Sequence, residues 1–209
     1  MKRLSLILLL SFGVTIAHAQ LFYPLGVGIG LTGKMGVNAG DIPQGEKTEL
    51  AIAPLPNFFA SAWYIVSQKE DFGFALDVGY TTNTFIMKPY QNVTDQNRFQ
   101  YILSYLSVHP YIRFKMFNLG VGLGFPLSGK RENVAGTISQ ELSNLATAIE
   151  LRFKLSVPVY RDATGKVSFW ITGAYQLNGI YASDIPNNPK VASAGIGFSY
   201  HFHFRLWEY

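Results

Sequence analysis

Hydrophobic and polar side chains alternate along most of the chain, most clearly in residues 191–204. One set of alternate positions there is apolar or aromatic, and the other set is mostly small or polar. The first set comprises Ala192, Ala194, Ile196, Phe198, Tyr200, Phe202 and Phe204, and the second comprises Val191, Ser193, Gly195, Gly197, Ser199, His201 and His203. Because successive side chains of a β-strand point to opposite faces, this pattern predicts a strand with one apolar and one polar face.

Seven further segments alternate in a similar way. Together with the C-terminal segment, they give eight expected strands, which cover residues 25–38, 51–66, 72–88, 98–116, 119–128, 143–160, 167–182 and 191–206. The connectors alternate between long and short, as in outer-membrane barrels, where short turns lie at one end and long loops at the other. The pattern predicts an all-β fold, an eight-stranded antiparallel up-and-down transmembrane β-barrel with short periplasmic turns and longer extracellular loops. Both chain ends would lie in the periplasm.

The chemistry of the strand faces separates this prediction from a soluble alternative. Glu150, Arg152 and Lys154 alternate with apolar side chains, so charge falls on the inward face. A lipocalin-like barrel or a β-sandwich also has alternating faces, but there the apolar face forms the core. The expected strands exceed the usual length of about five or six residues. Aromatic side chains near the strand ends fit interfacial girdles and also favour the membrane barrel, namely Trp63, Tyr64, Tyr80, Tyr101, Tyr175 and Phe204.

Side-chain directions can be predicted for individual strands. The residues expected to face lipid in segments 72–88 and 143–160 are Phe72, Phe74, Leu76, Val78, Tyr80, Leu145, Ile149, Leu151, Phe153, Leu155 and Val157. In residues 98–116 the apolar positions change parity, from Tyr101, Leu103 and Tyr105 to Val108, Ile112 and Phe114. Because one extra residue reverses side-chain direction, we expect a bulge near Ser107.

The N-terminus has the three parts of a secretory signal peptide. Lys2 and Arg3 precede an apolar stretch, and Ala17-His18-Ala19 forms an A-x-A cleavage site. We therefore expect a signal peptide over residues 1–19 and one barrel domain over residues 20–209. The sequence contains no cysteine, and the 17 basic against 13 acidic residues include the two basic residues of the signal. This nearly balanced mature charge argues against nucleic acid as a partner.

These features together resemble a known class. The signal peptide, the eight alternating segments, the unequal loops and the aromatic-rich end GIGFSYHFHFRLWEY are similar to the OmpA/OmpX-like eight-stranded barrels of the bacterial outer membrane, and more loosely to the PorT-like family. The resemblance implies outer-membrane location, contact with lipid and lipopolysaccharide, and the barrel-assembly machinery as a partner during biogenesis. Trp207 and Tyr209 resemble the terminal aromatic assembly signal, although their parity differs from that of Phe204.

Two histidines on one strand face form the first candidate constellation. Ser199, His201 and His203 make an S-x-H-x-H row, which could serve metal binding, Ser-His catalysis or packing. Tetrahedral zinc needs three or four ligands, and no third is assignable, so the sequence favours packing. Symmetric closure of the preceding loop would place His203 opposite Trp170 and His201 opposite Thr172.

Charged residues on the inner face form the second candidate constellation. Asp77 is expected opposite His109, either as half of an acid–base device or as an internal polar contact, and the absence of an assignable third member favours the contact. Four bases share the lower inner face, namely Arg113, Lys115, Arg152 and Lys154. They could attract an anion at the periplasmic mouth, but a solvated end with long side chains reaching water is the favoured interpretation.

No catalytic, cofactor-binding or metal residue is therefore assigned. An eight-stranded interior is filled by side chains, which predicts a non-enzymatic scaffold acting through its extracellular loops, with an envelope protein as a further partner. One alternative is an accessory component of an outer-membrane secretion or surface-assembly system. The other is an outer-membrane enzyme that modifies lipid or lipid A.

Overall fold

The computed structural model describes residues 25–67, 69–162, 164–183 and 185–204. The expected signal peptide and the aromatic pair Trp207 and Tyr209 lie outside these residues. The described residues form eleven strands: β1 (Leu25–Asn38), β2 (Glu46–Glu49), β3 (Ala51–Ile52), β4 (Asn57–Ser67), β5 (Phe72–Pro89), β6 (Phe99–Phe114), β7 (Phe117–Asn133), β8 (Ser139–Glu141), β9 (Ala148–Arg161), β10 (Gly165–Gln176) and β11 (Val191–Phe204). No helix in the described part of the chain is long and apolar enough to cross a membrane.

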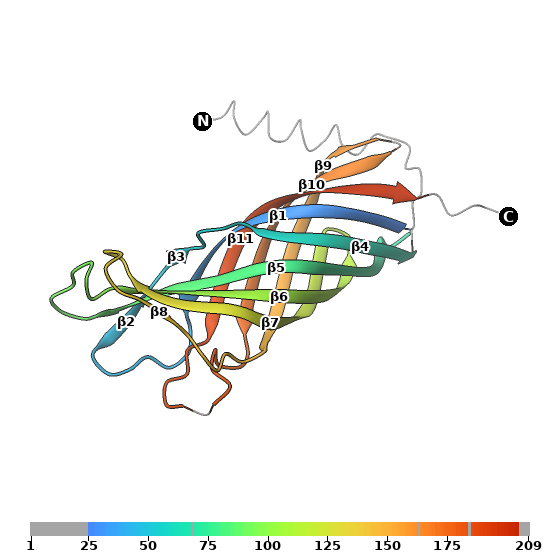
Figure 1. Cartoon of the computed structure of the whole chain (residues 1–209). Coiled ribbons are helices and arrows are strands. Elements are labelled where there is room, and N and C mark those ends of the chain that lie inside the picture. Colours follow the sequence, from blue (N-terminus) through green and yellow to red (C-terminus); the bar gives the residue numbers. More distant parts are fainter. Residues whose placement is uncertain (1–24, 68, 163, 184, 205–209) are drawn as a thin grey trace, which may run out of the picture.

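Eight of these strands close into a ring. The order β11-β10-β9-β7-β6-β5-β4-β1 is antiparallel throughout, and β1 returns to β11 from the pair Leu25 and Phe204 to the pair Asn38 and Val191. The three short strands extend the ring at one end, where β2 pairs with β5, β3 with β1 and β8 with β7 (Figure 1). Closure gives every ring strand a hydrogen-bonded neighbour on both sides, so the ring has no free edge strand. The predicted eight-stranded antiparallel up-and-down barrel is confirmed.

The two ends of the barrel differ in their connections. The connections from β4 to β5, from β6 to β7 and from β9 to β10 are short and lie at the end where β1 begins and β11 ends, which we call the termini end. The long connections lie at the opposite, loop end. At the termini end, the Asp162 carboxylate accepts hydrogen bonds from the Thr164 hydroxyl at 2.7 Å and from the backbone N–H groups of Gly165 and Thr164 at 2.8 Å. These hydrogen bonds close the turn and lower the pKa of Asp162 to about 2.

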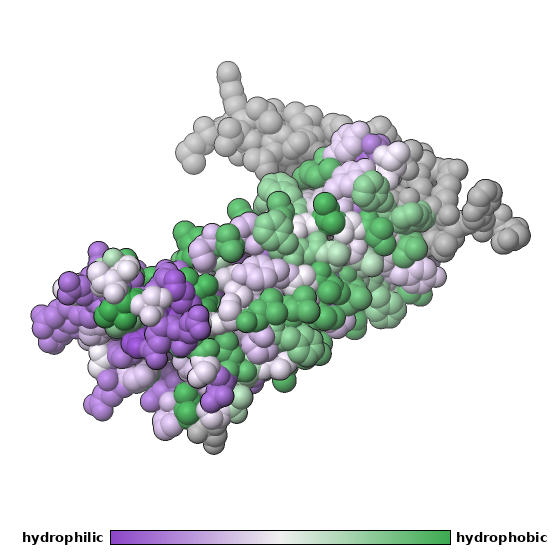
Figure 2. Space-filling view, in the orientation of Figure 1, coloured by the Kyte–Doolittle hydropathy of each residue, from purple (hydrophilic) through white to green (hydrophobic). Residues whose placement is uncertain are grey.

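An apolar belt covers the outer surface of the ring. Ile29, Leu119 and Ile196 are among its most exposed members, with 68%, 57% and 57% of their surface accessible. In Figure 2, hydrophobic side chains run along the barrel, whereas hydrophilic ones gather around the loop end. The predicted outward faces are confirmed at Phe74, Leu76, Val78, Ile149, Leu151 and Phe153, all of which are exposed.

Several details of the expected strands are wrong. Trp63 is not interfacial but 5% exposed and inward, because Gly26 opposite it leaves room for the indole: a Cβ at Gly26 would lie 2.5 Å from the ring. β6 has no bulge near Ser107. The irregularity in its pairing with β7 lies between Ser104 and Tyr105, and the inward side chains of β6 keep one parity past it. The apolar side chains in the loop-end part of β6, such as Leu103 and Tyr105, face the interior.

The register of the last hairpin also differs from the expectation. β10 ends at Gln176 instead of near residue 182, so Trp170 pairs with Gly197 and Lys166 with His201. The physical reason lies in Asn178, which binds the β9 edge: its side chain accepts from Ile149 N and donates to Thr147 O, each at 2.8 Å. The chain therefore leaves the β10–β11 ladder early. Because the register changes by an even number of residues, His201 still faces inward.

Candidate functional site: the barrel interior

A buried ion pair in the interior joins two strands, β5 and β9, that are not neighbours in the ring. The Asp77 carboxylate of β5 accepts from Lys154 Nζ of β9 at 2.9 Å and from Ser61 Oγ of β4 at 2.6 Å. Asp77 is only 4% exposed, so its charge needs these partners. The Lys154 ammonium also lies 4.4 Å from the ring centroid of Trp170, within cation–π range. This contact ties three parts of the ring together across the lumen.

A second buried pair lies nearer the loop end. Arg152 Nη1 donates to Glu150 Oε2 at 2.7 Å and lies 2.9 Å from His109 Nε2. The other Glu150 oxygen accepts from Asn83 Nδ2 at 2.8 Å, and Asn83 in turn accepts from Lys34 Nζ. All five side chains are buried. We call the two ion pairs and these partners the central network, which comprises Lys34, Ser61, Asp77, Asn83, His109, Glu150, Arg152 and Lys154.

The predicted pair of Asp77 and His109 is thus only half formed. The two residues are direct cross-strand partners, as expected. Their side chains nevertheless contact different groups, because Lys154 and Ser61 occupy the Asp77 carboxylate while His109 faces Arg152. A carboxylate that does not hydrogen-bond the imidazole cannot orient it as a general base.

An apolar cluster fills the loop end of the interior. We call it the loop-end plug, and its buried members are Phe85, Met87, Leu103, Tyr105, Ala148, Ile180 and Val191. Phe85 stacks on Tyr101 with a centroid distance of 4.6 Å and an angle of 8°. Ile180 reaches the cluster from the connection between β10 and β11, where its N–H donates to Pro189 O at 2.9 Å. The plug therefore combines strand side chains with a folded loop.

The histidine row lies toward the termini end. His201 is buried, and its Nδ1 lies 3.1 Å from Ser199 Oγ. The expected partners were wrong: His201 pairs with Lys166 and Gly28, while His203, whose side chain is not described, pairs with Gly26. Within the described residues, no group of three His, Cys, Asp or Glu side chains could hold a metal ion. The row thus presents one serine–histidine contact inside the barrel.

A polar cavity of about 280 Å³ opens at the termini end. Trp63 forms part of its wall, and its charged lining comes from several strands and turns: Asp71, Arg113, Lys115, Lys154, Arg161 and Lys166. Of the four bases predicted for the lower inner face, Arg113, Lys115 and Lys154 lie here, whereas Arg152 lies deeper in the central network. We call this space the termini-end cavity.

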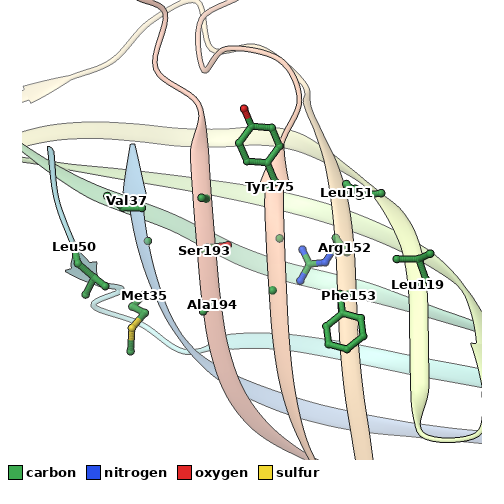
Figure 3. A pocket seen from close by; sticks show the side chains of 14 residues that line it. Met35, Val37, Leu50, Leu119, Leu151, Arg152, Phe153, Tyr175, Ser193 and Ala194 are labelled. Carbon is green, nitrogen blue, oxygen red and sulfur yellow. The ribbon is translucent and has the colours of Figure 1, made fainter. Parts of the chain in front are cut away.

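The outer surface carries a shallow apolar groove of about 500 Å³. Figure 3 shows Met35 of β1, Tyr175 of β10, Phe153 of β9 and Leu119 of β7 around it. Ala194 and other small residues also line it, and its large apolar side chains are exposed on the belt. The groove is continuous with the apolar belt and suits hydrocarbon more than a polar ligand.

Ion pairs also order the loop end. Glu49 of β2 accepts from Lys88 of β5 and, at 2.7 Å, from Arg98, which also pairs with Asp95 at 2.9 Å. The hydrogen bond from Lys88, with the charges of Arg98 and Lys88, lowers the pKa of the Glu49 carboxyl. We call these four residues the loop clamp, because they join the first long connection to the second.

Sequence reasoning missed several residues of the interior. Lys34, Ser61 and Asn83 belong to the central network, and Lys166 lines the termini-end cavity. Lys166 falls in a predicted turn because β10 begins at Gly165, two residues before the expected start of its strand. Lys34 stands on the inward parity of residues 25–38, so the alternation itself could have identified it.

Comparisons with known proteins find small outer-membrane proteins at low sequence identity. No family model matches the chain, and no curated protein matches it. Neisserial surface protein A (NspA) is 12% identical, with a TM-score of 0.41, over 87% of this chain and 97% of that one. OprG, an outer membrane protein of Pseudomonas aeruginosa, is 16% identical, with a TM-score of 0.38, over 87% and 98%. Ail, the attachment invasion locus protein of Yersinia pestis, is 15% identical, with a TM-score of 0.38, over 87% and 100%.

The chain's own closed strand order defines its class. The protein is an eight-stranded antiparallel up-and-down β-barrel with an apolar outer surface.

Proposed function

We propose that the protein is a non-enzymatic barrel of the bacterial outer membrane that serves as a scaffold through its extracellular loops. The single observation that carries this proposal is the filled interior beneath an apolar outer belt. The central network and the loop-end plug occupy successive levels of the lumen. A barrel that is apolar outside and filled inside offers its loops, not a channel, for interaction.

The loop end supports an interaction role. β2 and β8 lengthen the hairpins beyond the ring, and the loop clamp holds two of the connections together. Exposed apolar side chains lie among the polar ones at this end, including Tyr90, Val93, Val134 and Ile138. Such a pre-ordered surface suits an envelope protein or lipopolysaccharide as a partner, because little ordering entropy remains to be lost on binding.

The membrane assignment is tested by heat modifiability and conductance. The folded barrel in detergent is expected to migrate faster on gel electrophoresis before boiling than after it, since a ring without free edges resists the detergent. In planar bilayers it is expected to give no steady conductance steps. A detergent-independent soluble monomer would overturn the membrane assignment, and stable channels would overturn the filled interior.

Topology is tested with single cysteines, for which the chain offers a background free of native thiols. An impermeant maleimide applied to whole cells is expected to label cysteines at Gln44, Asn92 and Lys130 but not one at Thr164. Labelling at Thr164 alone would reverse the orientation.

The non-enzymatic part of the proposal is tested at the serine–histidine contact. A His201→Gln variant is expected to leave the lipid and lipid A profile of the cell unchanged, as does deletion of the whole gene. A lipid change that deletion and His201→Gln share would instead establish an enzyme.

A further inference from the structure

Positive charge in the termini-end cavity exceeds the negative charge around it. Its lining holds five cationic side chains and a single carboxylate, Asp71. Lys154 is already paired with Asp77, and Arg113 lies 3.4 Å from Asp71. Lys166 and Lys115 have no carboxylate within salt-bridge distance among the described residues. Lys115 is exposed to water, whereas Lys166 is half-buried and is the cation that most needs an anionic partner.

The same cavity contains hydrogen-bonding atoms without partners. Arg113 Nε and Ser168 Oγ are buried and make no hydrogen bond with the described residues. Buried polar atoms are normally paired, so each has capacity for a further group in the cavity. Both residues line the cavity and belong to different strands, β6 and β10. A ligand that bridges them would be held from two sides.

An aromatic wall adds a third feature. The Trp63 ring lies 4.9 Å from Lys166 Nζ and 5.3 Å from Arg113 Cζ, measured to its centroid. These cation–π contacts restrain both cations at one wall of the cavity instead of leaving them free to reach bulk water. The fixed cations are thereby pre-organised for an anion.

We propose that the termini-end cavity binds a small phosphate monoester. Such a group carries about −1.5 to −2 charges at neutral pH and three acceptor oxygens, which matches the cationic lining and several free donors better than one carboxylate does. Arg113 and Lys166 are the principal ligands, and the cavity of about 280 Å³ has room for the phosphate and a short organic group. This inference goes beyond the scaffold role and does not depend on the orientation of the barrel.

The proposal is tested by calorimetry on the folded, full barrel in detergent. The probes are glycerol 3-phosphate and inorganic phosphate, with acetate as the monoanionic comparison. Arg113→Gln and Lys166→Gln are each expected to weaken glycerol 3-phosphate binding by about 10-fold, because each removes a charged hydrogen-bond donor. Lys69→Gln is the matched control, since Lys69 is exposed in a turn at the same end and does not line the cavity.

The outcomes separate the binding site from its alternatives. Tighter binding of both phosphates than of acetate, lost in the two cavity variants and retained in Lys69→Gln, supports the proposal, and the ratio of the two phosphates shows whether the organic group contributes. Equal weakening in all three variants indicates a diffuse charge effect and overturns it, as does equal affinity for acetate. Unboiled gel mobility confirms that each variant is folded, and a negative result here leaves the scaffold proposal standing.

Discussion

The two halves of the barrel interior are built differently. Toward the loop end the lumen is closed by apolar side chains in the loop-end plug, several of which are completely buried. Toward the termini end it passes from the paired charges of the central network to a cationic cavity. Apolar packing closes a space by shape, whereas buried charges remain stable only as complete sets of partners. Truncating an apolar side chain of the loop-end plug and removing one partner of a buried ion pair should therefore lower the stability of the barrel by different amounts.

The largest effect is expected when one partner of the central ion pair is removed. Lys154→Met leaves the buried Asp77 carboxylate with Ser61 as its remaining hydrogen-bond donor. We expect the free energy of unfolding, measured by urea titration in lipid vesicles, to fall by about 3–5 kcal/mol.

Two further variants sharpen this result. The double variant Asp77→Asn with Lys154→Met is expected to recover most of the loss, because neither charge is then buried alone. Lys130→Met, which breaks the exposed pair with Glu132, is expected to cost no more than about 1 kcal/mol. A loss in Lys154→Met as small as that of Lys130→Met would contradict the assigned role of the central network.

In the other half, Leu103→Ala creates a cavity in the loop-end plug. Leu103 is fully buried, so a loss of about 2–5 kcal/mol is expected in the same titration. Since no charge is involved, the loss should be the same in acid and neutral buffer. Leu106→Ala, on the exposed face of the same strand, is the control and is expected to cost clearly less. Equal losses would show that the plug does not pack as described.

The sequence predicts the ring well because membrane strands repeat one simple alternation. Residues 25–38 and 72–88 are recovered almost to the residue, and the assignment of faces holds for Phe74 to Val78 in β5 and for Ile149 to Phe153 in β9. It is wrong at Leu145, which packs against the loop-end plug instead of facing outward. The errors fall where a local contact overrides the pattern. Asn178 ends β10 early through hydrogen bonds to β9, and no periodicity in the sequence reports such a contact.

The interior is less predictable because the position of a residue in the alternation shows which way its side chain points but not which side chains it contacts. Asp77 and His109 are correctly placed opposite each other, yet a lysine from a strand across the lumen takes the carboxylate. Contacts between strands that are not neighbours depend on the cross-section of the ring, which sequence spacing does not specify. The cationic cavity has the same origin, since its charges come from several separate strands and turns.

The outer face gives the next expected effect. Phe153→Arg places a cation on the apolar belt, and a loss of about 2–4 kcal/mol is expected if the residue lies near the bilayer midplane. Ser139→Arg in the exposed strand β8 is the control and is expected to be nearly neutral. The yield of heat-modifiable protein after folding into vesicles measures both. Equal yields would contradict the membrane-facing assignment of β9.

The smallest effect is expected at the loop clamp, where the charges are partly exposed. Glu49→Gln weakens the links to Lys88 and Arg98, and a loss of at most about 1 kcal/mol is expected at neutral pH. Because folding lowers the pKa of Glu49 below its ordinary value of 4.5, its contribution is present above that value and disappears as the pH falls through the folded pKa. Wild type and variant should therefore converge in strong acid and separate above pH 4.5. Asp95→Asn, which removes only one exposed partner of Arg98, should show a smaller separation, and a constant difference across this range would exclude the carboxylate as its cause.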